Sequence, residues 1–114
     1  MSGRSSRAKG YHAEKAVVDW LREKGFKYAE RRRAGGVNDT GDIVGVIPGM
    51  VIEVKNHARM TLAEWMDQLK AEIVNLDAWT GAVIHKRKGT TDVGEWYVTM
   101  PASVWLELVK EADT

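Results

Sequence analysis

The sequence contains no cysteine, only two prolines and a single phenylalanine among its 114 residues. Without cysteine the chain has no disulfide, no thiolate zinc site and no cysteine nucleophile, so a metal ion would need oxygen or imidazole ligands. The sequence also lacks an apolar run near the roughly 20 residues of a membrane helix, and its basic, polar start does not resemble a secretion signal. We therefore expect a soluble, cytoplasmic protein with no membrane contact.

The sequence has almost no excess of either charge, because 17 Lys and Arg residues are balanced by 16 Asp and Glu residues, for a net charge of +1. The distribution is uneven, however. Residues 1–33 carry ten basic and four acidic side chains, whereas residues 34–114 carry seven and twelve. Such an asymmetry favours contact between the basic end and a nucleic acid or another acidic surface, although a solvated basic face gives the same pattern.

Hydrophobic periodicity divides the chain into helices and strands, with no internal repeat and no domain boundary. The pattern predicts the order α-β-β-β-α-β-β-α, over residues 10–24, 26–31, 42–47, 50–55, 62–76, 80–86, 95–100 and 101 onward. This order indicates an α/β fold with a mixed central β-sheet flanked by helices. We expect residues 1–8 to form a basic, flexible arm and residues 9–114 to form a single domain.

Two of the predicted helices are marked by their first residues. Thr61 and Glu64 have the spacing of a capping box, so a helix is expected to begin at Leu62. Pro101 suits the start of the last helix. The apolar side of that helix is expected to be buried and comprises Val104, Trp105, Leu108 and Val109. The five tryptophans are interpreted as core or interface residues rather than as platforms for stacked bases.

Three ionisable side chains are expected to meet on a predicted hairpin. A Pro-Gly turn at residues 48–49 separates two β-branched runs, which should pair as antiparallel strands. Alternation places Glu53 and Lys55 on one face of the second strand, and the hairpin brings Asp42 beside them. Burying these charges is costly without a partner or a ligand, so the cluster is either a functional site or an edge-strand ion pair that faces water.

The chemistry of this cluster suits a hard divalent cation. Carboxylate oxygens are the ligands that Mg²⁺ or Mn²⁺ prefers, and Asp42 and Glu53 supply two of them. Lys55 is placed to orient or deprotonate the attacking water, as phosphodiester hydrolysis requires. Glu14 lies at the edge of the apolar stripe of the first helix, so its carboxylate should be directed toward the sheet. It is a candidate third metal ligand, directly or through water.

Basic residues surround the expected site. Arg31, Arg32 and Arg33 lead into a glycine-rich loop immediately before Asp42, where they are placed to hold phosphates. A solvated loop is the alternative interpretation. The other basic residues expected to contact DNA are Arg7, Lys9, Lys86, Arg87 and Lys88.

These residues carry a resemblance to a known enzyme family. Gly41-Asp42 followed by Glu53-Val54-Lys55, with Glu14 on a preceding helix and Gln68 on the next one, looks like the PD-(D/E)XK nuclease superfamily. Within it, the chain resembles the small archaeal-type Holliday-junction resolvases and the resolvase-like endonucleases of phages that infect actinobacteria. The resemblance covers roughly residues 7–86.

The resemblance implies a restriction-endonuclease-like fold, a homodimer with two active sites and Mg²⁺- or Mn²⁺-dependent cleavage of branched DNA such as four-way junctions. It also implies a role in DNA recombination or repair, in the bacterial host cell if a phage encodes the protein. By position, Glu14 matches the family's helix carboxylate, Asp42 and Glu53 its metal ligands, Lys55 its catalytic lysine and Gln68 its helix glutamine. The chain departs from the family pattern at Gly41, where proline is usual.

Other functions remain open on the sequence alone. A non-catalytic DNA-binding or regulatory module would use the same basic residues, with the acidic cluster in a structural role. Other PD-(D/E)XK nucleases, including repair and restriction-like enzymes, share the same core motif. A third alternative is an interaction protein that dimerises through tryptophan-rich surfaces and does not contact DNA.

Overall fold

The computed structural model describes residues 3–32 and 41–114. In this part of the chain, three α-helices and a short 3-10 helix accompany five β-strands. In chain order these are α1 (Gly3–Glu23), β1 (Glu30–Arg31), β2 (Ile43–Val44), β3 (Met50–Lys55), α2 (Leu62–Asn75), β4 (Thr80–His85), η1 (Val93–Glu95), β5 (Tyr97–Thr99) and α3 (Ala102–Ala112). Among the described residues, no helix is both long enough and apolar enough to cross a membrane.

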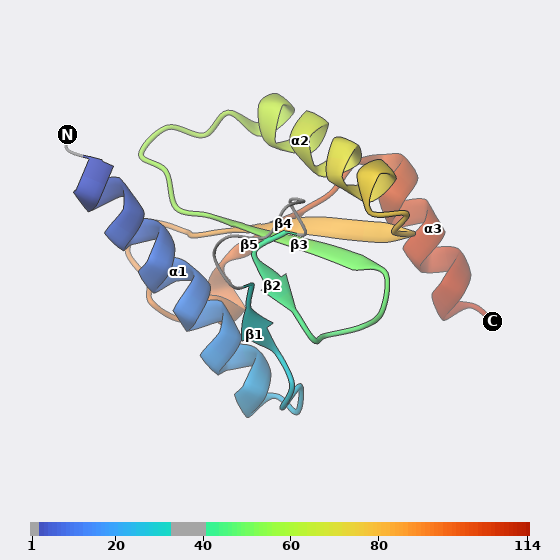
Figure 1. Cartoon of the computed structure of the whole chain (residues 1–114), viewed down its shortest axis with the longest axis horizontal. Helices are drawn as coiled ribbons and strands as arrows, with labels where there is room; N and C mark the ends of the chain where they lie inside the picture. Colours follow the sequence, from blue (N-terminus) through green and yellow to red (C-terminus); the bar gives the residue numbers. More distant parts are fainter. Residues whose placement is uncertain (1–2, 33–40) are drawn as a thin grey trace.

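The strands form one open, mixed sheet in the order β1-β2-β3-β4-β5 (Figure 1). β3 and β4 are parallel and joined through α2, whereas the other neighbouring pairs are antiparallel. The predicted α/β class with a mixed sheet is therefore confirmed. The central pair β3 and β4 is also the longest, which agrees with its burial on both faces.

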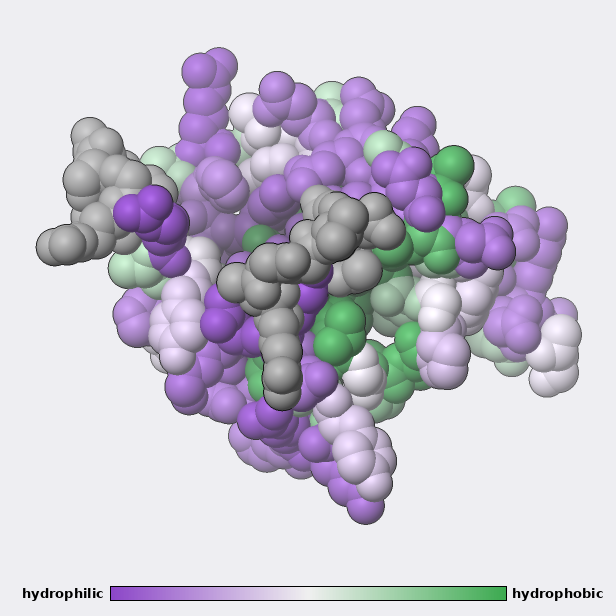
Figure 2. Space-filling view, in the orientation of Figure 1, coloured by the Kyte–Doolittle hydropathy of each residue, from purple (hydrophilic) through white to green (hydrophobic). Residues whose placement is uncertain are grey.

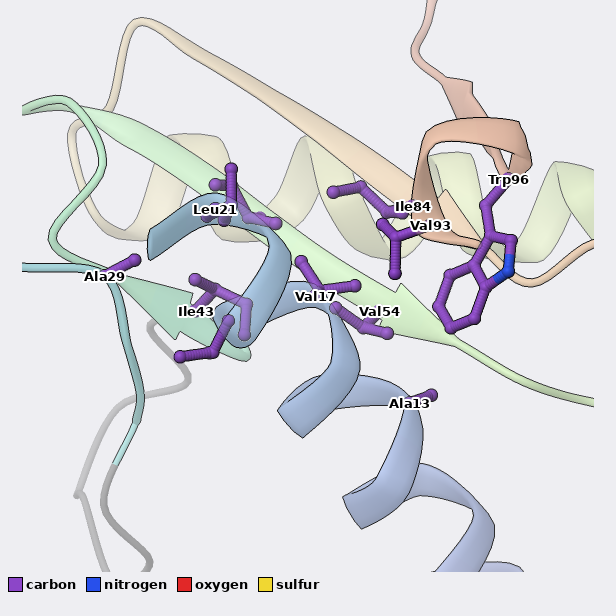
Figure 3. Close-up of a cluster of buried hydrophobic side chains, with 11 residues drawn as sticks. Ala13, Val17, Leu21, Ala29, Ile43, Val54, Ile84, Val93 and Trp96 are labelled. Carbon is purple, nitrogen blue, oxygen red and sulfur yellow. The ribbon is translucent and has the colours of Figure 1, made fainter. Parts of the chain in front are cut away.

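The two faces of β3 pack against different helices. Ile52 and Val54 face α1, where they join Val17 in one apolar cluster (Figure 3). Val51 faces α2 and contacts a second cluster that includes Leu69. The predicted alternation along this strand is thus correct. It sends Glu53 and Lys55 toward α2, because they share the face of Val51.

The first helix begins earlier than predicted. It starts at Gly3 rather than near Gly10, so residues 3–8, predicted to form a basic, flexible arm, belong to the helix. The prediction relied on apolar spacing, and a polar stretch beyond the core carries none. Ala, Arg and Lys nevertheless have high helix propensity, and no proline interrupts the segment.

The first two strands, β1 and β2, are shorter than predicted. β1 spans two residues instead of the expected 26–31, and β2 spans two instead of 42–47. The predicted tight turn is a longer loop, because Gly45 adopts a φ of +85° that most residues avoid. A Cβ at Gly45 would also collide with the Tyr28 carbonyl oxygen. The chain therefore bends away from the ladder one residue after Val44.

The second helix begins at Leu62, as predicted. The capping box is not formed, however, because the Thr61 side chain makes no capping hydrogen bond. Trp65 and Leu69, which lie one helical turn apart, are buried. The apolar stripe therefore specifies this helix more strongly than its cap does.

The last helix is less buried than predicted. None of its residues is fully buried, and Trp105 and Val109 are 54% and 40% exposed instead of lying in the core. Periodicity identifies which side of a helix is apolar but not what covers that side. Val98 of the neighbouring edge strand β5 is 60% exposed, so apolar side chains of β5 and α3 remain open to solvent.

Candidate active site

The backbone before β2 fixes the position of the Asp42 carboxylate. Gly41 has a φ of +84°, and the Asp42 N–H donates to the Ile52 carbonyl oxygen at 2.8 Å. The Asp42 side chain then accepts a hydrogen bond at Oδ2 from the Val54 N–H at 2.7 Å. Because Ile43 pairs with Ile52, the same register sets Asp42 opposite Glu53. The two predicted metal ligands are therefore neighbours.

Glu53 is the most perturbed ionisable group of the site. Its side chain is buried, with 3% of the residue exposed, and it hydrogen-bonds to the carboxyl groups of Glu72 and Asp42. Burial is the main reason why the pKa of Glu53 rises to about 11, and the hydrogen bonds and like charges of Glu72 and Asp42 add to it. One of its oxygens, Oε1, is buried without a hydrogen-bond partner. The carboxyl group thus carries a proton in the absence of a cation.

Sequence reasoning missed Glu72, which is a buried acid on α2 and only 4% exposed. The Gln68 Nε2 donates to Glu72 Oε1 at 3.3 Å, and Glu72 in turn contacts Glu53. A signal was present in the sequence. Glu72 lies three residues after Leu69 and seven after Trp65, which places an acid on the inward stripe of the helix.

The structure brings Lys55 and Gln68 into contact, and both were predicted to belong to one site. The Lys55 Nζ donates to Gln68 Oε1 at 3.0 Å, and the Gln68 amide bridges onward to Glu72. A continuous set of polar contacts therefore runs from Lys55 through α2 back to Glu53. This set holds the Lys55 ammonium group at the end of β3, with its side chain partly open to solvent.

Glu14 lies next to the carboxylate pair but is held by an arginine. Its pKa is raised by burial and by the Asp42 charge, and lowered by the hydrogen bond and charge of Arg31. The Arg31 Nε donates to Glu14 Oε1 at 2.9 Å, and the guanidinium carbon lies 4.5 Å from the centre of the Tyr11 ring. Glu14 lies beside Asp42 on the side of the site, and Arg31, predicted to contact phosphate, is exposed and paired with Glu14.

The residues predicted to contact DNA do not all lie in one place. Lys9 and the consecutive residues Lys86, Arg87 and Lys88 line one cavity together with Lys55, although these three segments lie far apart in the sequence. Arg7 is exposed on α1, and the Arg32 backbone N–H donates to the Asp42 carbonyl oxygen at 3.0 Å. Arg33 lies outside the described residues.

The residues present fit a magnesium ion held mainly by water. In the part of the chain that the structure describes, no three His, Cys, Asp or Glu side chains are arranged to hold a metal ion. Mg²⁺, however, keeps several waters and is usually bound through one or two carboxylates. Asp42 and Glu53 supply such a pair, and the unpartnered Oε1 of Glu53 is an acceptor that a cation would satisfy. A cation would also offset the burial and the like charges that together keep Glu53 protonated.

The arrangement can therefore support metal-assisted attack of water on a phosphate ester, with a cation site beside an ammonium group. Comparisons of the chain with protein-family models, with curated proteins and with solved structures find no match. The functional assignment accordingly depends on the geometry of these residues.

Proposed function

We propose that this chain is a Mg²⁺-dependent DNA endonuclease with a restriction-endonuclease-like fold that cleaves branched DNA, such as four-way junctions. One observation carries the proposal. Asp42, Glu53 and Lys55 lie together at the end of a buried strand, and α2 adds Gln68 and Glu72 behind them. A cluster of this kind is expensive to keep in a core, so a catalytic use explains its retention better than a stabilising one.

Each residue has a distinct role in the proposed reaction. Asp42 and Glu53 would hold the metal ion, which would supply Lewis-acid activation and charge neutralisation at the phosphate. Lys55 orients the attacking water and stabilises the negative charge that develops on the phosphate oxygens. Gln68 positions the Lys55 ammonium through the 3.0 Å hydrogen bond. Glu72 accepts from Gln68 and shares its contact with Glu53, so it couples the lysine to the metal ligands.

Glu14 and Arg31 tune the charge beside the metal ligands. Arg31 offsets the negative charge that Glu14 would otherwise add beside Asp42. Glu14 would be a further candidate ligand to the metal, directly or through water. DNA then contacts the basic side chains that surround the site.

The proposal includes a homodimer with two active sites. The surface that a second copy would bury consists of exposed apolar side chains on β5 and α3. These are Val98, Trp105, Leu106 and Val109. An exposed edge strand next to an apolar helix is a recurrent setting for self-association.

A cleavage assay tests the function. Wild-type protein should nick a labelled four-way junction in Mg²⁺ and leave it intact in EDTA, and Asp42→Asn or Lys55→Ala should reduce the rate at least a hundredfold. The matched controls are Asp67→Asn and Lys70→Ala, because both residues are exposed on α2. Wild-type rates in the first two variants would refute the proposal. Salt-dependent junction binding with no metal-dependent cleavage would instead favour the non-catalytic DNA-binding module.

A further inference from the structure

A cavity of about 620 Å³ opens beside the candidate site. It lies at the carboxyl ends of the parallel strands β3 and β4, where Lys55 and His85 end the two strands. Open α/β sheets commonly bind ligands at this edge. The volume is within the range of pockets that enclose a molecule the size of a nucleotide. Lys55 belongs to both the cavity and the candidate active site.

Four aromatic rings form a continuous row along this cavity. The ring centres of His57 and Trp65 are 5.7 Å apart, those of Trp65 and His85 are 5.5 Å apart, and those of His85 and Tyr97 are 5.6 Å apart. The inner two rings, Trp65 and His85, are 6% and 7% exposed, whereas Tyr97 is 50% exposed and His57 is also exposed. The row therefore has a rigid middle and two accessible ends.

The inner part of the row is fixed and uncharged near pH 7. His85 lies 2.7 Å from the Thr99 hydroxyl through Nε2, and burial lowers its pKa. The neutral imidazole and the Trp65 indole, both almost fully buried, form an apolar floor between the exposed rings of His57 and Tyr97. Neighbouring ring planes are tilted by 47–58°, so a nucleobase would stack on one exposed ring at a time, through the flat face that every base offers regardless of sequence.

The remaining wall of the cavity is strongly basic. Its five basic side chains are Lys9, Lys55, Lys86, Arg87 and Lys88. No acidic side chain among the described residues lines it. The Lys86 N–H donates to the Lys55 carbonyl oxygen at 3.0 Å, which ties the basic loop after β4 to the end of β3. The cavity thus combines an aromatic surface with a site for phosphate.

We propose that this cavity holds an unpaired nucleotide of the DNA substrate, with its base against the His57–Trp65–His85–Tyr97 row and its phosphate on the basic wall. A base in a duplex has both faces stacked and cannot enter, whereas a nucleotide at an open branch point or on a flap can. The inference deepens the proposed nuclease function and rests on it, because Lys55 would then lie next to the phosphate of the captured nucleotide. The enzyme would then select DNA that carries an unpaired nucleotide.

Binding of a short single strand in EDTA tests the pocket without the reaction. The probes are a fluorescein-labelled dT pentamer, the same sugar-phosphate chain without bases, and free thymidine monophosphate. Wild-type protein should bind the dT pentamer at least about tenfold more tightly than the abasic chain, the effect of one stacked base. Equal affinity for both chains would overturn the proposal. Free thymidine monophosphate that binds as tightly as the pentamer would assign the cavity to a free nucleotide instead.

Variants at the accessible ends of the row locate the effect. Tyr97→Ala and His57→Ala should each weaken binding of the dT pentamer about tenfold, and Tyr97→Phe should retain wild-type affinity because it keeps the ring. The matched control is Tyr28→Ala, since Tyr28 is 74% exposed and does not line the cavity. Thermal melting identifies any variant that fails to fold. Unchanged affinity in both folded alanine variants would refute the pocket.

Cleavage assays separate this inference from the proposed function. If wild-type protein cuts junctions in Mg²⁺ and Asp42→Asn does not, but the row variants bind the dT pentamer normally, the pocket is wrong and the nuclease stands. If no DNA is cut while the row variants lose binding, the nucleotide pocket stands and the nuclease is wrong. A junction with abasic sites at its branch point should be cut about tenfold more slowly than the intact one.

Discussion

Replacing Glu53 by glutamine should stabilise the protein in the absence of metal. The ordinary pKa of 4.5 is raised to about 11 in the folded chain, mainly by burial. Between these values the folded protein holds a proton that the unfolded chain has released, so the free energy of unfolding falls by about 1.4 kcal/mol per pH unit as the pH rises. Glutamine has the same shape, is neutral at every pH and can still donate to Asp42 or Glu72.

The size of the gain follows from this linkage. At pH 7 the buried carboxyl group keeps a proton about 2.5 pH units above its ordinary pKa of 4.5, which costs the folded state about 3 kcal/mol, so we expect Glu53→Gln to gain up to about 3 kcal/mol. The difference from wild type should grow with pH by up to about 1.4 kcal/mol per unit. The same substitution should abolish cleavage, because it removes a metal ligand.

Urea unfolding in EDTA at pH 6, 7 and 8 measures the effect. The matched control is Glu64→Gln, an exposed acid in the first turn of α2, which should change stability by less than about 0.5 kcal/mol. Addition of Mg²⁺ should stabilise wild type but not Glu53→Gln. A Glu53→Gln variant that is less stable than wild type at all three pH values would refute the reasoning about this carboxyl group.

Three further predictions concern the surroundings of the site. Gly41→Ala should lower the free energy of unfolding by about 1–2 kcal/mol and reduce cleavage, because φ is +84° and a Cβ would lie 3.0 Å from the Ile52 carbonyl oxygen. The control is Gly25→Ala, which should leave cleavage unchanged, since φ there is +111° but no atom lies within 4 Å of the added Cβ. Lys88→Ala should weaken junction binding, and the slope of the logarithm of the binding constant against the logarithm of the salt concentration should become shallower by about 1. An unchanged slope in a salt titration would contradict a phosphate contact. Trp105→Glu should shift the protein to monomer in sedimentation without unfolding it, whereas a persistent dimer would place the interface elsewhere.

Much of the arrangement of the carboxylates could be predicted from the sequence. Alternation along a strand is strict, so the faces of Glu53 and Lys55 follow directly from neighbouring Val51 and Ile52. The antiparallel pairing that sets Asp42 opposite Glu53 was also correct, although the turn between the strands was not. Local periodicity and strand pairing are the properties that a single sequence records well.

Other features depend on contacts between distant segments. The spacing of Glu72 marks it as an acid on the inward stripe of its helix, but only its contact with Glu53 of β3 makes it a member of the acidic cluster. The cavity was not predicted because its residues come from α1, β3, α2, β4 and β5. Figure 2 shows hydrophobic side chains gathered between the β2–β3 loop and α2 and α3, amid a largely hydrophilic face. Such tertiary groupings have no local signal in the sequence.

Direct titration with Mn²⁺, followed by electron paramagnetic resonance, tests the central claim that Asp42 and Glu53 together hold a divalent cation. Wild-type protein and the exposed-acid variant Asp67→Asn should each bind one ion per chain, and Asp42→Asn should bind at least tenfold more weakly. The same affinity in wild type and Asp42→Asn would contradict the account.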